Sequence, residues 1–188
     1  MFEEILKSFY YFLPAYLANA APVIFDQFRL LKNLKKPIDG GRKMGNDYIF
    51  GTTKTWRGLV AGVLVGTLTG LLQAALYLNS GEAKGMESPW FFFVRYNFEN
   101  ALFLGALLGF GILVGDLVKS FFKRRLHIKS TDPFFPFDQL DYLGALFLGT
   151  LFFPIPLLNF LIILLLSPLL PILANITAYT LGWKKVWW

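Results

Sequence analysis

Residues 59–78 read LVAGVLVGTLTGLLQAALYL, a run of 20 residues without a charged side chain. A helix that crosses the hydrocarbon core of a bilayer needs about 20 mostly apolar residues. The run therefore predicts a transmembrane helix over about residues 58–79. Three further apolar tracts lie around it, at Ile5–Phe25, Ala101–Val114 and Tyr142–Leu181.

The composition of the whole chain agrees with a membrane protein. Of its 188 residues, 55% are hydrophobic and 18% aromatic, and the mean hydropathy is +0.52. These values are high for a soluble domain and ordinary for a polytopic membrane protein. The chain contains no cysteine, which excludes structural disulfides and thiolate metal sites.

The last apolar tract spans 40 residues, which is too long for one span and long enough for two. The proline-rich segment PIPLLN at 154–159 is the natural place for it to turn. We therefore expect an all-α polytopic membrane protein, a single domain over residues 1–188. Its five transmembrane helices are expected at about 5–25, 58–79, 100–122, 141–156 and 160–181.

The distribution of lysine and arginine predicts the orientation. With five helices, 15 of the 18 basic residues fall on one side of the membrane, in loop 26–57, in the stretch from Lys119 to Lys129 at the end of the third helix, and at the C-terminus. Basic residues favour the cytoplasmic side. We expect the N-terminus outside, the C-terminus in the cytoplasm, and loops 26–57 and 123–140 at the cytoplasmic surface. Topology and attraction to anionic lipid would by themselves be enough to explain these charges.

Two predicted helices carry small residues at four-residue spacing. One has Gly62, Gly66 and Gly70, and the next has Ala101, Gly105 and Gly109. Small residues on one face let helix backbones approach closely in lipid. We expect these two faces to serve helix packing.

The end of the third helix carries an acid, a serine and lysines on one face. Asp116, Ser120 and Lys123 are spaced at i, i+4 and i+7, and Lys119 lies beside them. Ionisable groups at membrane depth usually mark a functional site. The alternative is an Asp116–Lys119 or Asp116–Lys123 pair that merely neutralises itself.

A second acidic pair lies at the predicted start of the fourth helix. Asp138 and Asp141 are three residues apart, so on a helix both carboxylates point the same way. Carboxylates without histidine or cysteine nearby suit hard cations, Mg²⁺ above all. Compensation of the helix N-terminus by acidic residues is the alternative.

Together these groups predict phosphate chemistry at the cytoplasmic mouth of the helices. A metal supported by lysine and arginine is the usual equipment for it, and the apolar helices offer access to lipid. The pattern suggests an enzyme that joins a soluble polyphosphate to a lipid phosphate.

Three other classes are open to consideration. A small transporter of an ion or a phosphate compound could use Asp and Lys, but would normally bind near the bilayer midplane. A non-catalytic protein that binds anionic lipid needs no aligned acids. The motif of the CDP-alcohol phosphotransferases is absent, because Asp39-Gly40 lacks the rest of it and Asp138 and Asp141 have the wrong spacing.

Two blocks of sequence resemble the phosphatidate cytidylyltransferase, or CDP-diacylglycerol synthase, family. GDLVKSFFKRRLHIK at 115–129, followed by the acids of PFDQLD, is similar to the family signature G-D-L-x-x-S-x-x-K-R-x-x-x-I-K-D with its later D-R-x-D. GTTKTWRGLVAG at 51–62 is similar to the upstream block P-x-K-T-W-x-G-x-x-G. The residues that match the signature are Gly115, Asp116, Leu117, Ser120, Lys123, Arg124, Ile128, Lys129, Asp138 and Asp141.

The departures from that signature point to the small archaeal branch, the CDP-archaeol synthases. Ser130 replaces the usual aspartate, Gln139 replaces the usual arginine, and PFFPF at 133–137 stands where the family has H-G-G. The branch's further motifs are matched over essentially the whole chain, at Asn19, Asp39, Gly51, Lys54, Thr55 and Arg57.

The resemblance implies that CTP and 2,3-bis-O-(geranylgeranyl)-sn-glycerol 1-phosphate give a CDP-lipid and pyrophosphate. Asp138 and Asp141 would hold Mg²⁺ with Asp116, while Lys123, Arg124 and Lys129 would hold phosphates and complete the catalytic set. Residues expected to contact CTP or the lipid phosphate are Asn19, Asp39, Lys54, Thr55, Arg57, Lys119, Ser120, Lys123, Arg124 and Lys129. No nucleic-acid partner is expected, and the sequence leaves the oligomeric state open.

Overall fold

The computed structural model describes residues 1–79, 97–128, 132, 134, 137 and 141–180. These residues form six α-helices: α1 (Phe2–Gln27), α2 (Trp56–Asn79), α3 (Phe98–Arg125), α4 (Asp141–Phe152), α5 (Leu157–Leu166) and α6 (Leu169–Thr180). By length and composition, α2 and α3 could each cross a membrane, and α4 and α5 are shorter apolar helices.

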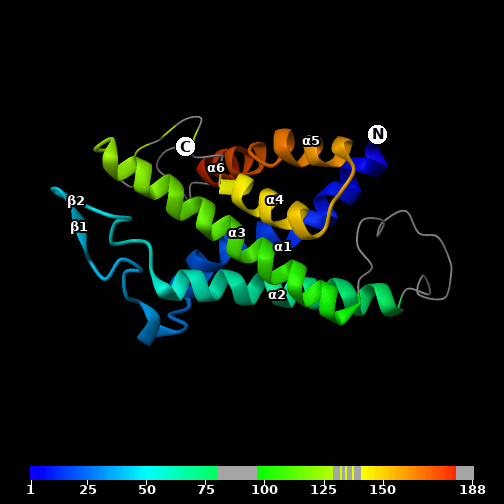
Figure 1. Cartoon of the computed structure of the whole chain (residues 1–188), viewed down its shortest axis with the longest axis horizontal. Coiled ribbons are helices and arrows are strands. Elements are labelled where there is room, and N and C mark those ends of the chain that lie inside the picture. Colours follow the sequence, from blue (N-terminus) through cyan, green and yellow to red (C-terminus); the bar gives the residue numbers. More distant parts are fainter. Residues whose placement is uncertain (80–96, 129–131, 133, 135–136, 138–140, 181–188) are drawn as a thin grey trace.

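The helices run back and forth along the long axis of the molecule (Figure 1). From α1 to α4 the direction reverses at each helix, and α5 and α6 follow one another along the same edge. The N-terminus lies at one end of this axis, and the loop between α1 and α2 lies at the other with the end of α3 (Figure 1). The two basic stretches therefore share one end of the molecule.

The prediction of a single last helix over 160–181 is wrong, because the chain forms α5 and α6 with a break at Ser167 and Pro168. Proline has no backbone N–H to continue the helical hydrogen bonds. The fully buried Ser167 is held at the break by a 2.7 Å hydrogen bond between its Oγ and the Tyr16 hydroxyl of α1.

Helix α4 also ends earlier than expected, at Phe152 rather than at residue 156. Prolines at 154 and 156 follow directly. A residue that precedes proline is disfavoured in helical conformation, so Phe153 and Ile155 leave the helix. The turn predicted around PIPLLN is thus confirmed, although it begins slightly earlier.

The loop between α1 and α2 departs from an all-α structure. It contains a 3₁₀ turn (Lys32–Leu34) and a short antiparallel hairpin of β1 (Lys43–Met44) and β2 (Asp47–Tyr48). Arg125 at the end of α3 donates to the Met44 and Tyr48 carbonyl oxygens, at 3.1 and 2.8 Å. The hairpin is therefore fastened to the end of α3.

The glycine faces of α2 and α3 serve helix packing, as predicted, and the structure shows that they pack against each other. A Cβ added to Gly66 would lie 2.6 Å from the Gly105 carbonyl oxygen, and one on Gly109 would lie 2.8 Å from that of Gly62. Both distances are too short for any side chain. The two backbones touch along this line.

A second glycine contact joins α3 to α4, and the sequence analysis did not predict it. A Cβ added to Gly111 would lie 2.6 Å from the Ala145 Cα. Gly115 lies against the backbone of Asp141, and Gly144 lies against the Gly111 carbonyl oxygen. This contact draws the start of α4 onto the end of α3 that carries Asp116.

Candidate functional site

Four charged side chains form a continuous chain of ion pairs between α2, α3 and α4. Lys54 Nζ, in the loop just before α2, lies 2.5 Å from Asp116 Oδ2. Lys119 Nζ lies 3.2 Å from Asp116 Oδ1 and 2.5 Å from Asp141 Oδ2. Lysine and aspartate thus alternate, and their formal charges cancel.

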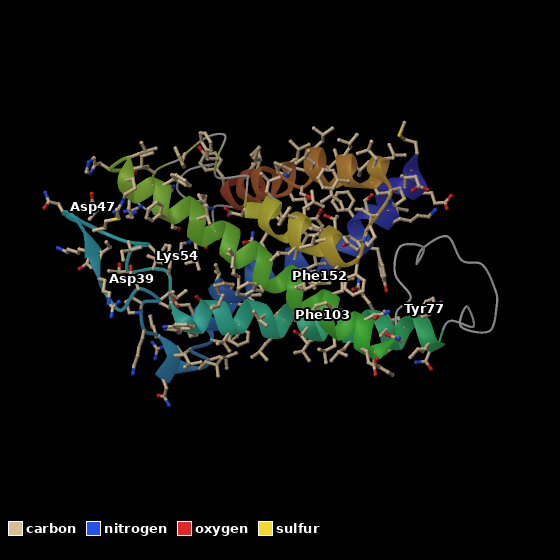
Figure 2. All side chains as sticks on the ribbon, in the orientation of Figure 1. Asp39, Asp47, Lys54, Tyr77, Phe103 and Phe152 are labelled. Atoms are coloured by element: carbon tan, nitrogen blue, oxygen red, sulfur yellow. The ribbon has the colours of Figure 1, made fainter. Side chains whose placement is uncertain are left out.

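This chain of ion pairs is mostly withdrawn from solvent. The side chains of Lys54, Asp116, Lys119 and Asp141 are 24, 21, 16 and 8% exposed. Lys54 lies at the same end of the molecule as Asp39 and Asp47 (Figure 2). Charges removed from water require partners, and each of these four has at least one.

One carboxylate oxygen in the chain has no hydrogen-bond partner. Within the described part of the chain, Asp141 Oδ1 is buried and no donor reaches it. A buried carboxylate oxygen left in this way is costly, and a bound cation would satisfy it. Asp141 Oδ1 is therefore a candidate ligand for a hard cation.

The described residues do not contain the full acidic cluster that was expected to hold the metal. No group of three or more acidic or histidine side chains with suitable geometry occurs among them. Asp116 and Asp141 are brought together through Lys119, while Asp138 lies outside the described residues. The expected phosphate ligand Lys129 also lies outside them.

The expected phosphate-binding face of α3 continues beyond the ion-pair chain. Ser120 and Lys123 are buried, and Lys123 Nζ donates to the Asp132 carbonyl oxygen at 2.6 Å. Arg124 lies against Gly51, and its buried Nε has no hydrogen-bond partner among the described residues. A φ of +95° at Gly51 favours glycine at this position of the upstream motif.

The motif at residues 51–62 contributes Lys54 to the ion-pair chain, whereas its Thr55 and Arg57 bind to neighbouring parts of the protein. Thr55 Oγ1 accepts a 3.2 Å hydrogen bond from the Gly58 N–H and so caps the start of α2. Arg57 is buried and donates to the Asp26 carboxylate, which also accepts from Lys35. The hydrogen bond from Arg57, and then that from Lys35, lowers the pKa of Asp26.

Two further predicted site residues have protein partners. Asp39 accepts hydrogen bonds from the backbone N–H groups of Gly41 and Phe50, at 2.9 and 3.0 Å, so it braces the loop. Asn19 on α1 donates to the Tyr142 hydroxyl at 3.4 Å. Since Tyr142 follows Asp141, Asn19 lies close to the start of α4.

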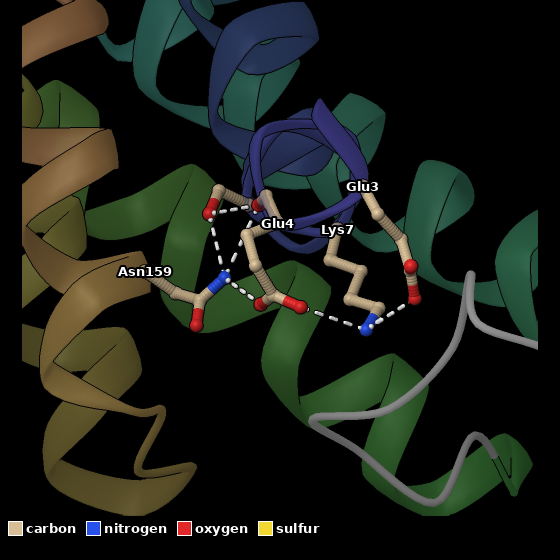
Figure 3. Close-up of polar contacts among 5 residues, drawn as sticks. Glu3, Glu4, Lys7 and Asn159 are labelled. Atoms are coloured by element: carbon tan, nitrogen blue, oxygen red, sulfur yellow. Dashed lines mark hydrogen bonds and ion pairs between the residues drawn. The ribbon is translucent and has the colours of Figure 1, made fainter. Parts of the chain in front are cut away.

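A second polar cluster, which the sequence analysis missed, joins α1 to α5 (Figure 3). Lys7 Nζ lies 2.7 Å from Glu3 and 2.9 Å from Glu4. The fully buried Asn159 donates to the Glu4 carbonyl oxygen, to Glu4 Oε2 and to Ser8 Oγ at 3.0–3.1 Å. The spacing of Glu3, Glu4 and Lys7 was the available signal, since such pairs are neighbours on a helix.

Comparisons with known proteins agree with these observations. A family model described as CarS-like, CDP-archaeol synthase, matches residues 1–188. The CDP-archaeol synthase of Thermococcus onnurineus is 41% identical over 192 residues, which cover 99% of this chain and 98% of the relative. That of Methanocaldococcus jannaschii is 38% identical over 200 residues and the full length of both chains.

A solved structure is also similar in fold. It is that of an intramembrane enzyme for archaeal membrane lipid biosynthesis, with a TM-score of 0.68 and 29% sequence identity. The similarity covers 92% of this chain and 94% of the other. Together with the apolar helices, it identifies the chain as a membrane protein.

Proposed function

This chain belongs to the CDP-archaeol synthase family, and on that premise we propose the details of its reaction. It is a cytidylyltransferase of archaeal membrane lipid biosynthesis. Its substrates are CTP and 2,3-bis-O-(geranylgeranyl)-sn-glycerol 1-phosphate, and its products are CDP-archaeol and pyrophosphate. The observation that carries the proposal is the alternating chain Lys54–Asp116–Lys119–Asp141 at the basic end of the molecule.

The reaction requires little covalent participation by the protein. A phosphate oxygen of the lipid, already anionic near neutral pH, attacks the α-phosphorus of CTP in line. A bond forms between that oxygen and the α-phosphorus, and the bond from the α-phosphorus to the bridging oxygen of the pyrophosphate breaks. Catalysis of this kind depends mostly on positioning and on stabilisation of charge.

Asp141 and Asp116, with Asp138, are the residues that would hold the divalent metal, which we take to be Mg²⁺. The unsatisfied Asp141 Oδ1 supports this assignment. When bound, such a metal neutralises charge on the phosphate oxygens of the transition state. The remaining basic residues on and after α3, Lys123, Arg124 and Lys129, bind phosphate oxygens of the nucleotide.

Lys54 and Arg57 have different roles in this proposal. Lys54 belongs to the ion-pair chain, and we assign its ammonium group to a phosphate of the substrates. Arg57 already donates to Asp26, so it supports the loop that carries Lys54. The side chains of Asp39 and Thr55 accept hydrogen bonds from backbone N–H groups and so help to hold the conformation of this loop.

The site faces the cytoplasm, where CTP is available. Both basic stretches lie at the end of the molecule opposite the N-terminus (Figure 1), and basic loops favour the cytoplasmic side. We therefore propose a multi-pass protein of the cell membrane with its N-terminus outside. The alternative of a small transporter is not favoured, because the family and its relatives are synthases.

The test is direct. Purified protein with Mg²⁺ and CTP labelled in its α-phosphate is incubated with the ether-isoprenoid glycerol 1-phosphate or with a diacylglycerol 3-phosphate. We expect labelled CDP-lipid from the first lipid and release of pyrophosphate. Labelled product from the diacyl lipid alone would show that the proposed lipid substrate is wrong. No product from either lipid would refute the proposed reaction. Replacing CTP by dCTP or ATP measures the preference for the nucleotide.

A further inference from the structure

Lys119 lies between the two carboxylates that the proposed metal would bridge. Its Nζ is 3.2 Å from Asp116 Oδ1 and 2.5 Å from Asp141 Oδ2. Lys119 and Asp116 are spaced at i, i+3 on α3, whereas Asp141 begins α4. One ammonium group thus joins two helices through their carboxylates.

We propose that Lys119 is a positioning residue that serves as an exchangeable counter-cation. Without metal, its ammonium holds Asp116 and Asp141 together, and it must leave Asp141 before a divalent cation can use both carboxylates. This inference rests on the proposed function and adds a step to it, namely competition between an internal lysine and the metal.

The electrostatics of the site support such a competition. Two carboxylates that face the same point in a mostly buried site repel each other unless a cation lies between them. The ammonium supplies that cation in the structure. A divalent ion at the same point would be repelled by the ammonium, and this repulsion is strong where the surroundings are poorly screened.

The surrounding contacts show how the exchange can occur. Lysine carries its charge on a flexible four-carbon stem, so Lys119 can withdraw while its backbone stays in α3. Asp141 Oδ1 is buried and accepts no hydrogen bond from the described residues, so it is an oxygen that a cation could take as a ligand once Lys119 has withdrawn. Lys54 remains on Asp116 Oδ2, so that carboxylate keeps a partner throughout.

The exchange also provides a use for the displaced ammonium. Lys119 is on the same helix as the buried Lys123, one turn away. Once it leaves Asp141, its charge is available to a phosphate group of the incoming nucleotide. The metal and the nucleotide would then each favour the binding of the other, which is a coupling between the two sites.

The test measures metal binding in the absence of substrate. Mn²⁺ is titrated into the purified full chain in detergent, and free Mn²⁺ is followed by electron paramagnetic resonance. We compare the wild type with Lys119→Met, which keeps an unbranched side chain, shorter by one atom, and removes its charge. We expect Lys119→Met to bind Mn²⁺ about tenfold more tightly or more, because the competing charge is gone.

Three control variants make the result specific. Lys35→Met removes an exposed lysine that is also paired with an aspartate, and it should bind Mn²⁺ as the wild type does. Lys119→Arg keeps the charge and should not bind more tightly. Adding Asp141→Asn to Lys119→Met should abolish the gain in affinity.

Several outcomes would overturn the inference. Unchanged or weaker binding by folded Lys119→Met, tighter binding by Lys119→Arg, or a gain that survives Asp141→Asn would each do so. Folding is followed by thermal unfolding monitored by the fluorescence of the 5 tryptophans. If Lys119→Met does not fold, Lys119→Gln, which also removes the charge, takes its place with the same expected gain and the same contrary outcomes. The cytidylyl-transfer assay with wild-type protein tests the proposed function independently of this result.

Discussion

Gly115 of α3 lies directly against the backbone of Asp141 at the start of α4, so that a Cβ at position 115 would collide with the Asp141 carbonyl oxygen. This contact sets the distance between α3 and α4 at the point where Lys119 reaches Asp141. The close approach of two backbones therefore positions the charged side chains beside it.

Gly115→Ala should impair the enzyme by separating α3 from α4. The added methyl group has no space, and overpacking of this kind costs about 1–3 kcal/mol in the free energy of unfolding. We expect a lower melting temperature and a loss of activity per folded molecule, because Asp141 moves away from Asp116. Val118→Ala is the matched control on the same helix, since Val118 is half-exposed. Normal stability and activity in Gly115→Ala would contradict the importance of this contact.

Removing either carboxylate of the ion-pair chain should stop turnover in a folded protein. For Asp116→Asn and for Asp141→Asn we expect kcat to fall by about 100-fold or more, as for other groups that stabilise charge in a transition state. The measurement is the rate of labelled CDP-lipid formation. Asp47→Asn is the control, because Asp47 pairs only with the exposed His127 among the described residues. Near-normal turnover in Asp141→Asn would show that the metal assignment is wrong.

Asn159→Leu should destabilise the protein without changing its chemistry. Asn159 makes three hydrogen bonds that join α5 to the start of α1 (Figure 3), and its loss leaves buried acceptors unsatisfied. Such a loss costs about 1–3 kcal/mol. The expected result is a lower melting temperature with an unchanged KM for CTP. Leu158→Ala, at an exposed neighbouring position, should have little effect. An equal loss of stability in both variants would argue against a stabilising role of the Asn159 hydrogen bonds.

The ion pair of Asp26 with Arg57 should make stability depend on acid pH. Because the folded protein lowers the pKa of Asp26 below its ordinary 3.8, the pair contributes stability above that pH. The contribution is lost as the pH falls through the lowered pKa, where the carboxylate becomes protonated. We therefore expect Asp26→Asn to melt earlier than the wild type at neutral pH, and the difference to shrink on acidification. A difference that does not change with pH would contradict this account.

The orientation in the membrane can be tested with single cysteines, because the natural chain has none. Glu3→Cys places a thiol at the exposed start of α1, and Asn46→Cys places one at the exposed turn of the hairpin. In intact cells, a membrane-impermeant thiol reagent should label Glu3→Cys and not Asn46→Cys. Permeabilised cells should show labelling of both. Labelling of Asn46→Cys alone in intact cells would show that the orientation is the opposite of the one proposed.

Much of this structure follows from local properties of the chain. Hydrophobicity over about 20 residues located α2 and α3, since a spanning helix satisfies its own backbone hydrogen bonds. The four-residue spacing of Gly62, Gly66 and Gly70 predicted a face for helix packing, because such spacing is a property of one helix, but it did not identify α3 as the partner. The break at Ser167 and Pro168 was missed because only the hydrophobicity of residues 160–181 was considered, although Pro168 is a local signal for a helix break.

The partners of the charged residues did not follow from the sequence. The helical spacing around Asp116 left a pair with Lys119 or Lys123 open as an alternative to a functional site. The structure contains the pair with Lys119 and adds Lys54, which is 62 residues away. Asp39 and Arg57 were expected to contact substrate. In the structure, Asp39 accepts hydrogen bonds from backbone N–H groups, and Arg57 donates to Asp26. The chemistry of a side chain determines which kinds of group it can bind, but the fold determines which of them lies close to it.

The sequence by itself therefore located α2 and α3, which are long and apolar enough to span a membrane, and the lysine and arginine residues that gather in two stretches of the chain. Only the tertiary structure decided that Lys119 lies between Asp116 and Asp141. The physical reason is that this arrangement depends on the contact of Gly115 with Asp141, two residues on different helices. An ion pair acts over a few ångströms, so it is determined by how closely the helices pack and not by the spacing of residues along either one.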